Sequence, residues 1–131
     1  MIGYILFILI LLFLISSIFA LSNELPREDK WKIRFAKDKW NSKSGTIIKY
    51  DKIEHFLCCF VLYFGFVLLK VDFLYSLYFV FLIGIIWEVK DAFLPWEKFG
   101  WYGGDGFSMK DLIADMSGVF LGTILVNLIM M

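Results

Sequence analysis

The sequence has little of what soluble enzymes and nucleic-acid-binding domains use. Its 13 lysines and arginines balance 13 aspartates and glutamates, so the net charge is zero when the single histidine is neutral. No basic surface with interleaved aromatic residues follows, and we do not expect nucleic acid as a partner. One histidine excludes the HExxH pattern of zinc hydrolases, and the GxSxG, P-loop and EF-hand patterns are also missing from the sequence.

Cysteine is scarce as well. The two cysteines, Cys58 and Cys59, are adjacent inside an apolar run. Successive residues of a helix point about 100° apart, so the pair cannot readily form a disulfide. No CxxC pattern supports a metal site either. We interpret both as reduced packing residues.

Long apolar runs are what the sequence does have. Hydrophobic residues make up 60% of the 131 positions, against roughly 45–50% in soluble domains. We predict an all-α, integral membrane four-helix bundle that forms a single domain over residues 1–131. Helices of ~20 residues cross a ~30 Å hydrocarbon core, and the predicted spans cover 2–22, 52–69, 73–91 and 109–131.

The first run, residues 2–22, has an alternative interpretation as a secretory signal peptide. Ala20 and Ser22 offer a small-x-small cleavage pair. However, the run has no basic segment before it and is longer than the usual ~7–15 residues of a signal core. We therefore expect an uncleaved helix.

The two long connections, 23–51 and 92–108, are expected on one face of the membrane. In the first, Pro26 suits the first turn of a helix, and Trp31 and Phe35 form an apolar stripe among basic residues. We predict a short amphipathic helix in the headgroup region, with a solvated basic loop as the alternative. The second, rich in glycine and aromatic residues, is typical of a membrane interface.

Charged side chains gather where the predicted helices meet these connections. Charges within spans are rare and usually face a bundle interior or a wet cavity. The residues that we expect to bind a ligand at this level are Asp51, Lys52, His55, Glu88, Asp91, Asp105, Lys110, Asp111 and Asp115. Capping and helix-dipole effects are an alternative explanation for several of these acids.

Two kinds of chemistry suit this set. A hard divalent cation prefers several oxygens with at most one imidazole, so the possible metal ligands are His55, Glu88, Asp111 and Asp115. Alternatively, His55 acts as a general base oriented by a carboxylate, which makes His55, Asp115 and Glu88 the catalytic candidates. Beyond this divalent ion, the sequence leaves the cofactor unknown.

Three segments resemble a known family. They are "DKIEHF" at 51–56, "IIWEVKD" at 85–91 and "DGFSMKDLIADMSGVFLG" at 105–122. In this order and spacing they resemble the VanZ-like membrane proteins, and especially their uncharacterised YfiM-like members. The resemblance covers about residues 50–125, and by motif it includes Asp51, His55, Glu88, Asp105, Asp111 and Asp115. The YfiM-like lipobox cysteine has no counterpart here, so a lipoprotein form is not expected.

The resemblance implies a four-span protein of the bacterial cytoplasmic (inner) membrane, in a family linked to low-level teicoplanin resistance. It also implies that the long loops face outward. The positive-inside rule alone places them in the cytoplasm, because nine of the 13 basic residues lie between Arg27 and Lys52. We prefer the outward orientation.

Three functions remain open at this stage. The first is binding of an amphipathic ligand, either a membrane lipid or a lipid-linked envelope precursor headgroup. The second is metal-assisted hydrolysis of a phosphorylated lipid. The third is a structural or accessory subunit without a ligand, which would pack against a partner helix or form a homo-oligomer.

Overall fold

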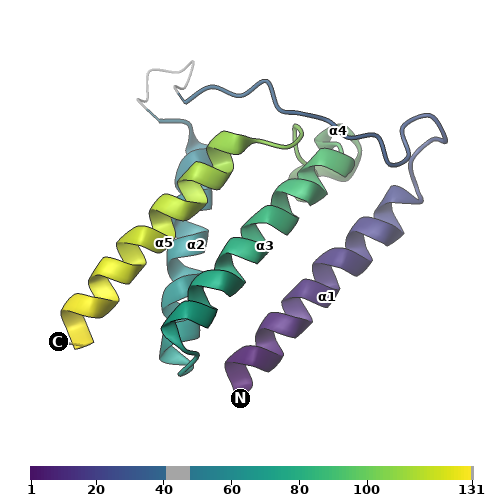
Figure 1. Cartoon of the computed structure of the whole chain (residues 1–131). Coiled ribbons are helices and arrows are strands. Elements are labelled where there is room, and N and C mark those ends of the chain that lie inside the picture. The colour runs from purple at the N-terminus through teal and green to yellow at the C-terminus, as the bar shows by residue number, and fades with distance from the viewer. Residues whose placement is uncertain (41–47, 131) are drawn as a thin grey trace.

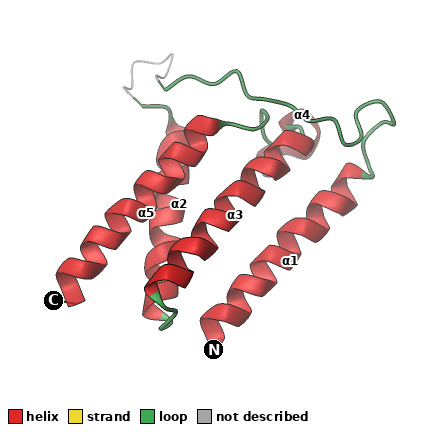
Figure 2. Cartoon of the chain, viewed as in Figure 1, coloured by secondary structure: helices red, strands yellow, loops and turns green. Residues whose placement is uncertain are grey.

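The described part of the chain folds into four long helices and two short helical turns. The computed structural model describes residues 1–40 and 48–130. The elements are α1 (Ile2–Ser22), α2 (Tyr50–Leu68), α3 (Phe73–Phe93), α4 (Trp96–Phe99), η1 (Gly100–Tyr102) and α5 (Met109–Met130). Figure 2 shows helices and loops, with no strand in the described residues. The all-α prediction is confirmed, and each predicted span matches one long helix.

Three of the long helices, α1, α3 and α5, are long and apolar enough to cross a membrane. The fourth long helix, α2, is not apolar enough by the same measure, because its first turns contain Asp51, Lys52 and Glu54. A membrane location therefore rests on the three apolar helices.

The long connections lie at one end of the molecule and both termini at the other (Figure 1). Helix α2 packs along α5, α3 contacts both, and α1 packs against α3. The polar beginnings of α2 and α5 and the polar end of α3 therefore meet at one level, beneath the loops.

Glycines allow α2 and α5 to approach closely. A Cβ atom at Gly118 would overlap the carbonyl oxygen of Phe56, and one at Gly122 would lie 2.8 Å from Tyr63 Cδ1. Small residues at helix interfaces permit such backbone approach in membrane proteins. Asp111 and Asp115 lie on the same stripe of α5, so they face α2.

The predicted amphipathic helix in the first connection is wrong for the described residues. The chain makes turns up to Trp31, whose φ is 62°, and then runs extended. The N–H of Arg34 donates to Ala92 O at 3.1 Å, and the N–H of Ala36 donates to Phe107 O at 3.0 Å. The two long connections thus form backbone hydrogen bonds with each other. These bonds satisfy backbone groups that the predicted helix would have satisfied internally. Residues 41–47 of this connection lie outside the described part.

Candidate functional site

The second connection, residues 92–108, folds over the ends of the helices at which both long connections lie (Figure 1). The N–H of Gly104 donates to Leu94 O at 2.8 Å, and Trp96 N–H donates to Gly104 O at 3.2 Å. Gly106 has a φ of 120°, and a Cβ there would lie 2.8 Å from the backbone carbon of Phe35. Glycine suits this position for both reasons. The glycines of this segment therefore let the two connections close over the helix ends.

A cavity of about 910 Å³ lies beneath this cover. Its walls come from α1, α2 and α3, with Leu9 and Phe13 on α1 and Leu62 on α2. Its polar end includes His55 and Asp115. Leu9 and Phe13 are exposed, so the cavity opens to the surface along α1. The same cavity therefore has apolar walls and, at one end, an imidazole and carboxylates.

Lys52 is the centre of the first polar cluster, and only 2% of its side chain is exposed. Its Nζ forms ion pairs with the carboxylates of Asp38 and Asp111, and lies 3.1 Å from Asp51 Oδ2. A buried ammonium needs such partners because leaving water is costly for an unpaired charge. These three carboxylates also lie close enough to suggest a metal group, but Lys52 already supplies the cation.

Asp38 joins the first connection to this cluster. It accepts a hydrogen bond from Ser108 Oγ at 2.7 Å in addition to its ion pair with Lys52. Burial would raise the pKa of this carboxyl, but the hydrogen bonds from Lys52 and Ser108 outweigh burial and lower the pKa to about 2. Lys110 donates to the backbone oxygen of Asp38 at 2.6 Å. The loop is therefore held to α2 and α5 through one residue.

A pH dependence follows for Asp38. Its folded-state pKa, about 2, is below the ordinary 3.8. The stabilisation is therefore fully present above about pH 4 and is lost as pH falls towards 2, and its size is about 2 kcal/mol. We expect the difference in unfolding free energy between wild type and Asp38→Asn to shrink by this amount between pH 6 and pH 2. Denaturation in non-ionic detergent measures it.

The control for this titration is Asp29→Asn. Asp29 pairs with Lys32 at 3.7 Å, and both side chains are exposed. Exposed pairs contribute ~0–1 kcal/mol, so this variant should follow wild type at every pH. An Asp38→Asn difference that stays constant from pH 6 to pH 2 would contradict the assigned role of Asp38.

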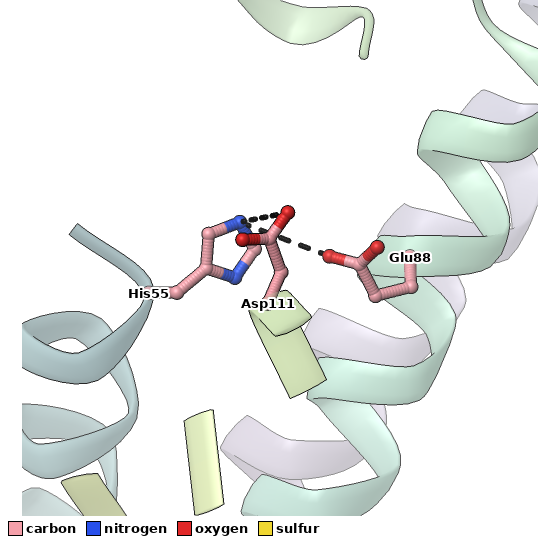
Figure 3. A group of neighbouring side chains, drawn as sticks. All are labelled: His55, Glu88 and Asp111. Carbon is pink, nitrogen blue, oxygen red and sulfur yellow. Dashed lines mark ion pairs between the residues drawn. The ribbon is translucent and has the colours of Figure 1, made fainter. Parts of the chain in front are cut away.

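His55 lies at the centre of the second cluster. Its Nδ1 is 3.0 Å from Asp115 Oδ1. An ionised carboxylate only accepts, so Nδ1 carries the hydrogen, and Nε2 of a neutral ring presents its lone pair. Nε2 lies 3.7 Å from Glu88 Oε1 and 3.9 Å from Asp111 Oδ2. Dashed lines mark both pairs in Figure 3. Gly84 gives Asp115 its space, since a Cβ there would lie 2.9 Å from Asp115 Oδ2.

Glu88 reaches the cluster from α3 and is fully buried. The backbone N–H of Ser108 donates to its Oε2 at 2.7 Å. Ser108 also begins α5, because its Oγ accepts the N–H of Asp111 at 3.2 Å. Ser108 thus caps α5 through its side chain, while the Asp111 carboxylate forms an ion pair with Lys52.

Three other predicted residues lie outside these two clusters. Asp91 Oδ1 is 2.5 Å from Lys90 Nζ. Lys90 is buried, donates to Tyr102 O, and lies 4.0 Å from the Trp87 ring centroid. Asp105 lines the cavity but is exposed. Lys110, described above, holds the loop rather than either cluster.

Sequence reasoning missed Asp38 and Lys90. Asp38 lies in a charged segment whose spacing gives no helical face, so no pattern distinguishes it from its neighbours. Lys90 had a signal that was not used, because a lysine within a predicted span is itself expected to face the interior and to be paired. Asp38 belongs to the Lys52 cluster, whereas Lys90 pairs with Asp91 and the Tyr102 backbone outside both clusters.

No match was found when the chain was compared with family models, with curated proteins and with solved structures. The site itself is therefore the basis for a functional argument. Its chemistry is one imidazole with three facing carboxylates, and His55, Asp111 and Asp115 of this set line the cavity. Such a set can bind a cation, position a proton acceptor, or hold a polar headgroup.

Proposed function

We propose that this chain is a small cell-envelope membrane protein that binds an amphipathic ligand, a lipid or lipid-linked precursor headgroup, in the cavity described above. The observation that carries the proposal is the continuity of that cavity from apolar walls to the His55 cluster. Ligand sites are mostly apolar spaces with a few convergent polar groups. An acyl chain fits the apolar walls, and a headgroup fits the polar end.

The opening of the cavity supports access from the membrane. Leu9 and Phe13 of α1 and Cys58 of α2 line the cavity and are exposed. In a bilayer, exposed apolar residues of this kind face lipid. We propose α2 as the fourth span, because its charged first turn is satisfied at the Lys52 cluster rather than by water.

The three segments that resemble VanZ-like proteins meet at this cavity. The cavity is lined by Asp51 and His55 of the first, Asp91 of the second, and Asp111 and Asp115 of the third. Glu88 of the second lies 3.7 Å from His55 Nε2. Their convergence supports a shared role for the segments. We propose the bacterial inner membrane as the location, with the long loops facing outward.

The test is to fill the cavity. Leu62→Trp places an indole ring, which is larger than the leucine side chain, inside the cavity. Leu57 lies on the same helix, is exposed, and does not line the cavity. We expect Leu62→Trp to weaken binding of NBD-labelled phosphatidic acid at least about tenfold, or ~1.4 kcal/mol, and Leu57→Trp to leave it unchanged. Fluorescence titration of the full chain in nanodiscs measures both.

Equal binding by the two variants would contradict the proposal, provided that circular dichroism shows both to be folded. Absence of probe binding to wild type, together with stable association with a membrane protein partner, would favour the structural-subunit function. A probe with a neutral headgroup would show whether the phosphate contributes.

Hydrolysis of a phosphorylated lipid is a second candidate function. The hydrogen bond between Asp115 and His55 favours it, because a carboxylate that orients an imidazole is a common arrangement in acid–base catalysis. Release of phosphate or of the headgroup by wild type, lost in His55→Gln, would establish this function. Binding without turnover would leave the ligand-binding function alone.

A further inference from the structure

The free donor atoms of three residues converge where α2, α3 and α5 meet. They are His55 Nε2, Glu88 Oε1 and Asp111 Oδ2, and such ligand atoms all lie within 4.8 Å of one another. The distances from Nε2, 3.7 and 3.9 Å, are too long for hydrogen bonds. We propose that these atoms hold a divalent cation. Figure 3 shows how the three side chains point toward one another from α2, α3 and α5.

The imidazole is oriented as a metal ligand would be. Asp115 accepts the Nδ1 hydrogen of His55, so in the neutral ring, the form that binds a metal, the free lone pair is on Nε2. Metal-binding histidines almost always donate their other N–H to a carboxylate, a carbonyl or water. This assigns Asp115 to positioning the imidazole rather than to direct ligation.

Both carboxylates are held in the same manner. Ser108 N–H donates to Glu88 Oε2, so Oε1 is the oxygen that faces His55. Lys52 binds Asp111 Oδ1, so Oδ2 is the oxygen that faces His55. Each of the three proposed ligands therefore has one polar atom bound by another protein group. Its other polar atom is directed to the common point, at which the three free atoms converge.

Glu88 supplies an independent reason. It is fully buried, and its Oε1 has no hydrogen-bond partner among the described residues. A buried acceptor without a partner is destabilising, and more so when the group is charged. A cation at the common point would satisfy this oxygen and would also reduce repulsion between the carboxylates of Glu88 and Asp111.

The ligand set indicates the kind of ion. One imidazole and two carboxylates suit a first-row ion such as Mn²⁺ or Zn²⁺, whereas closed structural zinc sites use four cysteine or histidine ligands. Three protein ligands leave coordination positions open. His55 and Asp111 line the cavity, so an open position would accept a phosphate oxygen of the amphipathic ligand. This last step rests on the proposed function, while the cation site does not.

The cation site is tested with Mn²⁺ alone. The full chain in nanodiscs is treated with EDTA and titrated with Mn²⁺, and electron paramagnetic resonance measures the free ion. We expect wild type to bind Mn²⁺ and Glu88→Gln to lose at least about tenfold in affinity. Glu97→Gln is the matched control, because Glu97 is exposed on α4 and lies outside the cavity lining. Asp115→Asn should also weaken binding by roughly 10–100-fold.

Equal Mn²⁺ affinity of wild type and folded Glu88→Gln would overturn the cation site, as would absence of binding to wild type. If Glu88→Gln does not fold, His55→Gln gives the same readout. Leu62→Trp separates the two proposals, because it should lose the lipid probe and keep Mn²⁺. Probe binding without Mn²⁺ binding overturns the cation site alone, and Mn²⁺ binding without probe binding overturns the proposed function alone.

Discussion

Replacement of Lys52 by methionine is expected to lower the free energy of unfolding by about 3–5 kcal/mol, the usual effect of removing one partner from a buried ion pair. Methionine has a similar length but no charge, so the carboxylates of Asp38 and Asp111 would remain buried without their cation. The first connection would also lose its main attachment to α2. Unfolding in mixed detergent micelles, followed by circular dichroism, measures the loss.

Lys49→Met is the matched control for this change. Lys49 lies 3.5 Å from Asp38 Oδ1 and 3.7 Å from Asp51 Oδ2, so it pairs with two of the same acids, but 39% of its side chain is exposed. Exposed pairs contribute ~0–1 kcal/mol. Similar losses in the two variants would show that Lys52 is not the centre of the cluster. Partial recovery in Lys52→Met combined with Asp111→Asn would support the assignment.

Replacement of Gly118 by leucine is expected to separate α2 from α5 and to cost about 3 kcal/mol or more, the upper part of the range for overpacked interiors. Even a Cβ at this position would overlap the carbonyl oxygen of Phe56, and a backbone atom cannot move aside as a flexible side chain can. His55 and Asp115 lie on these two helices, so Mn²⁺ binding should also be lost. Thermal unfolding and the Mn²⁺ titration measure the two effects.

Gly65→Ala provides the comparison, because a Cβ at Gly65 would meet no atom within 4 Å. Alanine is favoured over glycine within helices by about 1 kcal/mol, so this variant should be as stable as wild type or slightly more stable. A folded Gly118→Leu protein with wild-type stability would contradict the close contact between α2 and α5.

Gly118→Leu and Lys52→Met disturb two different features of the α2–α5 pair. Gly118 sets the distance between α2 and α5, and Lys52 neutralises the acids that this approach brings together. The His55 cluster depends on both, since its residues come from α2, α3 and α5. A cluster built in this way needs a rigid pair of helices, and the small residues and the buried lysine provide it.

The sequence by itself determined the helices and their polar ends. Uninterrupted apolar runs leave few other options for backbone hydrogen bonds, so the spans 2–22 and 73–91 could be predicted closely. His55 near the start of α2 and Glu88 near the end of α3 were placed at one level, because only a short turn joins these two helices.

The tertiary structure alone decided which polar groups meet. The extended path of the first connection, the attachment of Asp38 to Lys52, and the pairing of Ala36 with Phe107 join segments that are far apart in the sequence. Local spacing carries no information about such contacts, because each depends on how the helices already pack. For the same reason, only the structure shows that the free atoms of His55, Glu88 and Asp111 point to one place.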